Sequence, residues 1–325
     1  MAVVLASVLS PASIAGACPA QSLEPVTDFR LERFYTDARS SQVRADIRAA
    51  NRAQSRPLKM FLNRIADVSD RAVLHGDRVA AECGLNALLK WTRADAMAGP
   101  MPTKQSEHHR KWALSGLALA YLKLKPFASL EARAGIEPWL QNLAGDAQAV
   151  FADGKTTRNN HYYWLGLAVG AVGLATDMPH YWDAARVILE RGLDDIDEDG
   201  HLPMEMARGR KALHYHVFAV TPLAVLTWLT AEKGQPVSPA RQRALTRLVE
   251  STLAGVRAPD LFSDKAGTAQ DLPSDRPNFA GYGWPALLTF RPSKVDAVAS
   301  LPAYGRRHRW LGGDIRALMA AVQKR

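Results

Sequence analysis

Apolar residues recur along the chain from about residue 42 with the i, i+3, i+4, i+7 spacing of a helix face. Breakers such as Gly99 and Pro100 fall between the periodic segments. The sequence shows no sustained apolar–polar alternation and no Asn-Gly turn, so a sheet is not expected. The spacing predicts helices at residues 42–75, 79–98, 108–125, 136–152, 160–176, 180–194, 212–233, 238–256, 279–290 and 310–324.

The predicted helices are of two kinds, which indicates how they pack. Residues 160–176 are apolar all round, whereas residues 180–194 are apolar on one side only. A helix of the first kind must be buried and one of the second kind lies outside it. Their alternation predicts an all-α fold, an incomplete (α/α) toroid of inner and outer helices. No flexible linker divides residues 18–325, so we expect a single domain.

Composition and charge narrow the class of protein. The chain has 325 residues, 47% of them hydrophobic and 22% charged, which is typical of a globular protein. Its 41 Lys and Arg exceed its 32 Asp and Glu, a net charge of +9 that attracts polyanions such as nucleic acid, acidic lipid or acidic polysaccharide. Nucleotide-binding and zinc-protease motifs are absent and the basic residues are dispersed, so we expect no nucleic-acid partner, no metal and no organic cofactor.

The N-terminal segment resembles an export signal. Residues 1–17 form a short apolar run that ends in Ala15-Gly16-Ala17, a small-x-small cleavage pattern, although a basic start is missing. The alternative is an ordinary apolar N-terminus. Export predicts a periplasmic protein, and no other run suggests a membrane span. In that compartment Cys18 and Cys83 could pair, whereas otherwise they would be two free thiols.

One candidate cluster lies at the start of the predicted helix 160–176. Asn160 and His161 are followed by Tyr163 and Trp164. Asparagine often caps a helix, and a lone histidine is often a core residue. The density of amide, imidazole, phenol and indole groups at the mouth of an inner helix nevertheless favours a binding or catalytic site.

A second cluster precedes the predicted helix 212–233. Arg208 and Lys211 lie just before the helix, where the dipole disfavours cations, so an anion is expected there unless this is a solvated basic loop. His214 and Tyr215 follow in the first turn. We expect the nearby cations to lower the pKa of Tyr215 below its usual value of about 10.

Two further segments carry groups that suit an acidic sugar. Arg110, Lys111 and Trp112 set cations beside an aromatic ring, although Trp112 would equally suit a core. Arg33 and Tyr35 lie before the first long helix and could belong to a lid. The competing interpretation of that stretch is a disordered leader.

The order and spacing of these motifs resemble the mannuronate-specific alginate lyases of polysaccharide lyase family 5 over roughly residues 18–315. The resemblance implies an (α/α) toroid and β-elimination of poly-β-D-mannuronate to 4,5-unsaturated uronate ends. It also implies a periplasmic enzyme, which we expect to act as a monomer. Its motifs are Cys18-Pro19, Cys83 with Leu85-Asn86, Arg110 to Leu114, Asn159 to His161, Tyr163-Trp164, Leu202-Pro203, Ala212-Leu213, Tyr215-His216 and Leu311 to Asp314.

The resemblance also implies roles for single residues. By position, the catalytic groups of the family fall on Asn160, His161, Arg208 and Tyr215, its disulfide on Cys18 and Cys83, and its lid near Arg33 and Tyr35. Two departures would add bulk near the cleft: Tyr162 stands where a serine is common, and His214 stands where an alanine is common.

Lyase chemistry at these residues follows from the acidity of the substrate. The charge of the uronate carboxylate must be neutralised before the C5 proton can leave, and Asn160, His161 and Arg208 are suited to this. Tyr215 could then remove the C5 proton and protonate O4, or His161 could act as base with Tyr215 as acid.

Three other functions stay open from the sequence. A lyase for glucuronan or another polyuronate would use the same chemistry. A glycoside hydrolase would need carboxylates such as Asp197, Asp199 or Glu205. A non-catalytic periplasmic polysaccharide-binding protein would need only the cations and the aromatic rings.

Overall fold

The computed structural model describes residues 18–151, 157–271 and 307–323. The expected export segment 1–17 and the predicted helix 279–290 lie outside the described residues. The described part is almost entirely helical, which confirms the all-α prediction. Its main helices are α1 (Ala45–Gln54), α2 (Arg56–His75), α3 (Arg78–Arg93), α4 (Lys104–Leu124), α5 (Leu130–Phe151), α6 (Asn160–Ala175), α7 (Pro179–Asp194), α8 (Pro203–Met206), α9 (Ala212–Glu232), α10 (Pro239–Arg257), α11 (Asp260–Ala266) and α15 (Ile315–Gln323).

The boundaries differ from the sequence prediction at a few places. The predicted helix 42–75 is two helices, α1 and α2, because Pro57 opens α2 and lacks the amide that a continuous helix would need. The short helices α8 and α11 were not predicted. A two-stranded antiparallel ladder also appears, formed by β1 (Arg307–His308) and β2 (Gly313–Asp314). The remaining elements are the 3-10 turns η1 (Lys125–Phe127), η2 (Gly209–Lys211) and η3 (Arg309–Leu311).

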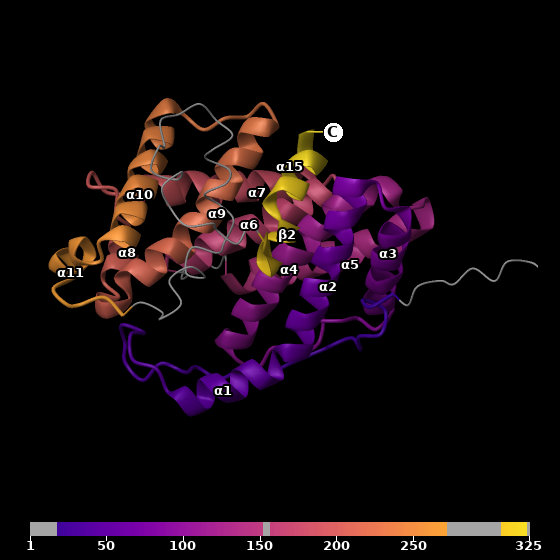
Figure 1. The fold of residues 1–325 in the computed structure, drawn as a ribbon, viewed down its shortest axis with the longest axis horizontal. Coiled ribbons are helices and arrows are strands. Elements are labelled where there is room, and N and C mark those ends of the chain that lie inside the picture. Colours follow the sequence, from indigo (N-terminus) through magenta and orange to yellow (C-terminus); the bar gives the residue numbers. More distant parts are fainter. Residues whose placement is uncertain (1–17, 152–156, 272–306, 324–325) are drawn as a thin grey trace, which may run out of the picture.

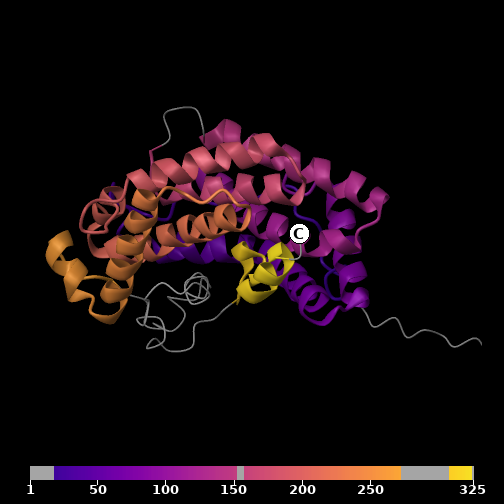
Figure 2. The same cartoon turned by 90° about the horizontal axis from the view of Figure 1, so that it is seen from above.

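The helices form the predicted toroid of inner and outer layers. The inner helices α2, α4, α6 and α9 pack side by side in that order, and α3, α5, α7 and α10 pack outside them (Figures 1 and 2). Helix α6 is buried nearly throughout, as its apolar sequence predicts. The C-terminal helix α15 contacts α2, α4 and α9, so it closes the open side of the ring between its first and last inner helices.

A buried ion pair ties the closing segment to the ring. Lys123 on α4 is fully buried, and its Nζ donates to the Asp70 carboxylate on α2 and to the Gly312 carbonyl. The other Asp70 oxygen accepts from the backbone amide of Asp314 at 2.9 Å. A buried ammonium needs such partners, because an unpaired one would be costly to desolvate. This pair therefore ties η3 and β2 to α2 and α4.

The N-terminal stretch is ordered along one end of the inner helices, as the indigo segment of Figure 1 shows. Leu31 is fully buried, and its backbone amide donates to Ser106 Oγ at 2.8 Å. The Glu32 amide donates to Asn51 Oδ1 at 2.9 Å. A disulfide joins Cys18 to Cys83 on α3, as predicted. The described part of this stretch is therefore not a disordered leader, and it carries Tyr35 to Tyr215 on α9.

Within the described residues, one segment has the length and composition of a membrane span. Residues Gly209–Glu232, which include α9, are apolar enough, yet 94% of the apolar window is buried inside the protein. The neighbouring helices α6, α7 and α10 cover it, which is the environment of a core helix.

Removing the disulfide should lower stability without changing the fold. The bridge closes a loop with a sequence separation of 65, which corresponds to about 4 kcal/mol of unfolded-state chain entropy. We expect the C18A/C83A variant to lose about 4 kcal/mol of unfolding free energy, measured by urea denaturation. A reductant should destabilise the wild type and leave the variant unchanged. Equal unfolding midpoints for the two oxidised proteins would contradict this expectation.

Candidate active site

A groove of about 470 Å³ opens at the end of the inner helices that the N-terminal stretch crosses. Its walls come from segments far apart in the sequence, and the toroid brings their ends together. The lining residues are Arg33, Phe34, Tyr35, Ser40, Arg48, Asn51, Arg52, Ser55, Lys59, Lys104, Gln105, His108, His109, Trp112, His161, Arg208, His214, Tyr215, Phe218, Arg309 and Trp310.

The lining carries many cations and no carboxylate. No Asp or Glu occurs among the described residues that line the groove. A groove with walls of one charge sign concentrates its field and favours a ligand of the opposite sign. The cations are Arg33, Arg48, Arg52, Lys59, Lys104, Arg208 and Arg309.

Aromatic rings form part of the groove wall. Trp112 on α4 packs against Trp310, with ring centroids 4.7 Å apart, and meets Phe218 edge-on at 5.4 Å. Trp112 is only 7% exposed, so it belongs to the core and to the groove lining at once. Rings beside cations suit a flat, anionic ligand with apolar C–H faces, such as a uronate sugar.

His161 lies at the start of α6 with its ring stacked on that of His108, at a centroid distance of 3.6 Å. The side chain of Asn159 caps the helix by accepting from the His161 amide at 2.9 Å. Burial, together with the nearby Lys111 and Arg208 cations, holds the pKa of His161 well below its usual value. The imidazole is therefore neutral at pH 7 and has a nitrogen able to accept a proton.

Tyr215 on α9 lies against the N-terminal stretch. Its hydroxyl donates to the Tyr35 hydroxyl at 2.8 Å, and the Arg208 guanidinium lies 4.8 Å from its ring centre. The expectation of a lowered pKa was wrong. Burial of the phenol raises the pKa of Tyr215 above 10, and the neighbouring Tyr35 raises it further. The Arg208 cation opposes this increase only in part. Tyr215 therefore carries its proton at neutral pH.

Asn160 is adjacent to the groove but does not line it. The residue is fully buried, and both its backbone amide and its side-chain Nδ2 donate to Glu205 Oε1, at 2.6 and 2.9 Å. The structure thus brings His161, Arg208 and Tyr215 together in the groove, with Asn160 directly behind His161 in the chain. Of the other predicted substrate contacts, Arg33, Tyr35, Trp112 and His214 line the groove.

Two predicted substrate-binding cations do not line the groove. Arg110 is buried and pairs with Glu107 and Asp146. Lys211 pairs with Asp271 at 2.7 Å. Glu107 lies three residues before Arg110 on α4, whereas Asp146 and Asp271 are distant in the sequence from the cations they pair with.

The other three predicted contacts are core residues. Lys111 is fully buried and donates to the His161 carbonyl at 2.7 Å, so it supports the groove from behind. Tyr163 donates to Asp195, and Trp164 donates to the Phe218 carbonyl. Tyr162, which departs from the family pattern, also lies outside the groove lining. Its hydroxyl accepts a hydrogen bond from Arg191 on α7.

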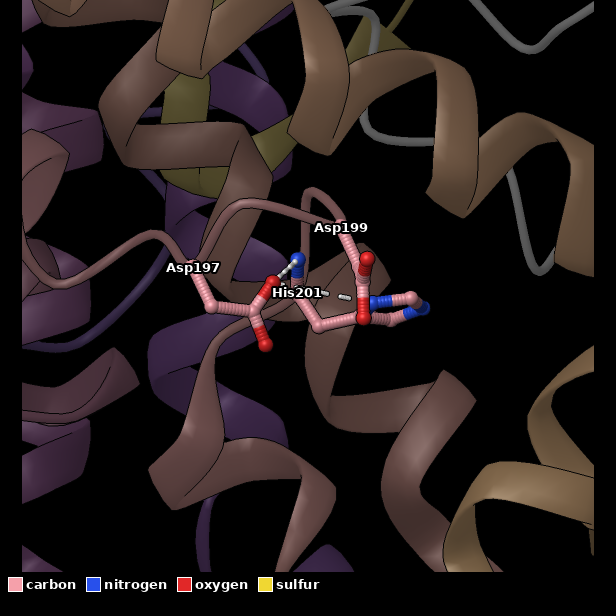
Figure 3. A group of neighbouring side chains, drawn as sticks. All are labelled: Asp197, Asp199 and His201. Carbon is pink, nitrogen blue, oxygen red and sulfur yellow. Dashed lines mark hydrogen bonds and ion pairs between the residues drawn. The ribbon is translucent and has the colours of Figure 1, made fainter.

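The acids considered for a hydrolase lie elsewhere. Asp197, Asp199 and His201 gather in the turn after α7, as Figure 3 shows. The Lys265 ammonium lies between the two carboxylates, 2.6 Å from Asp199 and 3.7 Å from Asp197. None of these residues lines the groove. The cluster is an ion-pair contact between this turn and α11.

Sequence reasoning missed much of the lining. The sequence indicated no role for His108 or His109, whereas both line the groove and His108 stacks on His161. Arg309 and Trp310 directly precede the motif that begins at Leu311, which was the available signal. Arg48, Lys59 and Lys104 had no local signal, because only the closed ring turns them toward one groove.

The protein is thus an all-helical toroid with a cationic, aromatic-lined groove at one end. A profile of the family described as alginate lyase matches residues 32–262. A polysaccharide lyase of Stenotrophomonas maltophilia is 38% identical over 320 residues, covering 97% of this chain and 94% of that protein. An alginate lyase of Pseudomonas syringae pv. syringae is 30% identical over 259 residues, covering 77% and 68%.

Solved structures of alginate lyase A1-III share the fold. A tetrasaccharide complex has a TM-score of 0.79 and 23% identity, covering 92% of this chain and 86% of its own. The structure from Sphingomonas species A1 has a TM-score of 0.75 and 24% identity, covering 93% and 86%. The chain belongs to the alginate lyase family. It is a polysaccharide lyase, a carbon–oxygen lyase that acts on polyuronates.

The groove histidines should stay neutral across the physiological pH range. Burial lowers the pKa of His109 to about 3 and that of His214 to about 4, and it holds those of His108 and His161 well below 6.5. A lowered pKa means that protons bind only at a pH below it, so none of the four rings should titrate between pH 8 and pH 6. Histidine Cε1–H NMR shifts, assigned with single His→Gln variants, measure this. A His161 midpoint near pH 6.5 would refute it.

Proposed function

We propose that this chain cleaves poly-β-D-mannuronate by β-elimination and leaves 4,5-unsaturated uronate at the new chain end. The observation that carries the proposal is a groove with cationic walls and no described acidic lining, which holds a protonated tyrosine and a neutral histidine. Family membership and the names of its relatives support alginate as the polymer. The tetrasaccharide complex of alginate lyase A1-III supports an oligosaccharide-sized groove.

The first requirement is to neutralise the uronate carboxylate. An ionised carboxylate leaves the neighbouring C5–H a very weak acid, because a second negative charge would develop beside the first. Arg208 supplies a fixed positive charge in the groove, and His161 lies in the groove at the start of α6. Asn160, buried directly behind the groove, keeps one Nδ2 hydrogen that Glu205 does not take. Donors held in place before the reaction stabilise the developing charge by several kcal/mol.

The second requirement is a pair of proton transfers. Tyr215 carries a proton at neutral pH and is suited to protonate the departing O4. The C5 proton passes to the neutral imidazole of His161 while Tyr215 protonates O4, or Tyr215 first gives its own proton to His161, takes the C5 proton as base and passes that proton to the departing O4. The first route uses two groups, whereas the second suits mannuronate, in which C5–H and O4 lie on one face. Neither route calls on a metal or an organic cofactor.

The alternatives from other classes have less support. A glycoside hydrolase needs two carboxylates facing the glycosidic bond, and the acids considered for this role do not line the groove. A binding protein needs no proton donor and acceptor in its groove, whereas Tyr215 and His161 both lie there. A glucuronan or broad polyuronate lyase shares all these features and differs only in the sugar.

We also propose a periplasmic location and a monomeric enzyme. A disulfide between Cys18 and Cys83 suits an oxidising compartment, and the apolar segment 1–17 precedes it directly. The groove is built from a single chain, so the reaction does not require a second copy.

A panel of polymers tests the function. Incubation with mannuronan should raise ultraviolet absorbance as unsaturated ends form, and glucuronan and guluronan should respond more weakly. New reducing ends without absorbance would indicate a hydrolase. Binding without cleavage would indicate a binding protein. A faster reaction on glucuronan would move the proposal to that substrate.

Tyr215→Phe removes the proposed acid with little change in shape. We expect at least a 10²-fold loss of kcat on mannuronan with the fold retained, measured by the same absorbance assay and by circular dichroism. Tyr121→Phe removes a hydroxyl that donates to Glu137 away from the groove, and this variant serves as the control.

A second substrate separates the acid from the base. A mannuronate unit with fluoride at C4 needs no acid to expel its leaving group. If His161 is the base, Tyr215→Phe should eliminate fluoride nearly as fast as the wild type; near-normal turnover of mannuronan would remove Tyr215 from its role.

A further inference from the structure

We propose that Glu205 is a positioning residue, which sets the orientation of Asn160 and Arg208 for the reaction. This inference rests on the proposed function, because it assigns a role within that site. Glu205 lies on the four-residue helix α8, between the turn after α7 and the segment that carries Arg208. Its side chain is fully buried and does not line the groove, so it cannot reach a substrate itself.

Asn160 contacts Glu205 through two separate groups. The Asn160 backbone amide, the first of α6, donates to Glu205 Oε1 at 2.6 Å, and Nδ2 donates to the same oxygen at 2.9 Å. A carboxylate only accepts hydrogen bonds, so it fixes which end of the Asn160 amide faces it. The second Nδ2 hydrogen is left for another acceptor, because only one is used by Glu205.

Arg208 contacts the other side of the same carboxylate. Glu205 Oε2 lies 3.7 Å from Arg208 Nε, and the Arg208 backbone amide donates to the Glu205 carbonyl at 3.1 Å. Arg208 in turn places its guanidinium over the Tyr215 ring, 4.8 Å from the ring centre. One carboxylate thus joins the start of α6 to the cation that lies against the proposed acid.

A buried carboxylate is expensive to desolvate unless it has strong partners. Burial raises the pKa of Glu205, and the Asn160 amides and Arg208 oppose that effect. The Glu205 carboxylate also lies at the start of α6, where the free backbone amides carry partial positive charge and favour a negative group. A purely structural contact would be satisfied by an uncharged amide of similar shape. The charge, however, is what aligns the donors of Asn160 and Arg208 toward one point.

The test is Glu205→Gln, which keeps the size of the side chain and removes its charge. We expect kcat on mannuronan to fall about tenfold to hundredfold while KM changes less than threefold, because the orientation of catalytic groups is lost rather than substrate contacts. Glu137→Gln is the matched control. Glu137 is a half-buried carboxylate that accepts from Tyr121 and pairs with Lys125, away from the groove. Removing the Glu137 charge should leave kcat unchanged.

A double-mutant cycle separates positioning from a structural role. If Glu205 acts through Asn160, Glu205→Gln should cost much less activity in the Asn160→Ala background than in the wild type. Equal losses in both backgrounds, or an unchanged kcat for Glu205→Gln, would overturn the inference. If Glu205→Gln does not fold, Glu205→Asp goes through the same cycle, since it keeps the charge and withdraws it from Asn160. A wild type inactive on every polyuronate would instead overturn the proposed function.

Discussion

The concentration of positive charge in one groove is the constraint on which the rest of the site depends. Cations from the N-terminal stretch, α1, α2, α4, η3 and the segment before α9 meet there, and no described lining residue is acidic. The cations that line one groove repel one another, and the low dielectric of a groove strengthens that repulsion. The helical ring must therefore hold them together, and its packed inner helices provide the rigidity. A bound polyanion would relieve the repulsion, which links the electrostatics of the free protein to its proposed substrate.

Ion pairs with carboxylates occur next to the groove rather than in its described lining. Glu107 pairs with Arg110, and Asp271 pairs with Lys211, and neither pair lines the groove. Glu205 pairs with Arg208 from the buried side. This arrangement neutralises part of the charge for stability and leaves the groove itself positive. Of these three paired cations only Arg208 lines the groove, although all three looked alike in the sequence.

The sequence predicted the fold well because helix periodicity reports burial directly. The all-round apolar stretch at 160–176 could only be an inner helix, and it is α6. The sequence predicted the site less well, because a local cluster of cations does not reveal which way each side chain points. Tyr163 and Trp164 were placed in the site for their chemistry, yet both side chains are buried in the core. The predicted direction of the Tyr215 pKa shift was wrong for a related reason: neighbouring charges are visible in a sequence, whereas burial is not.

The contact between Tyr215 and Tyr35 connects the fold to the chemistry. In the free protein the Tyr215 hydroxyl donates to Tyr35, which belongs to an N-terminal stretch held by backbone hydrogen bonds at Leu31 and Glu32. In the proposed reaction the same proton must go to the O4 atom of a sugar. Binding of the polymer therefore has to redirect the Tyr215 hydroxyl from one oxygen to another. Because Tyr35 contributes to the high pKa of Tyr215, that exchange also changes how firmly the acid holds its proton. The N-terminal stretch thus takes part in setting the acid, beyond its role as a wall of the groove.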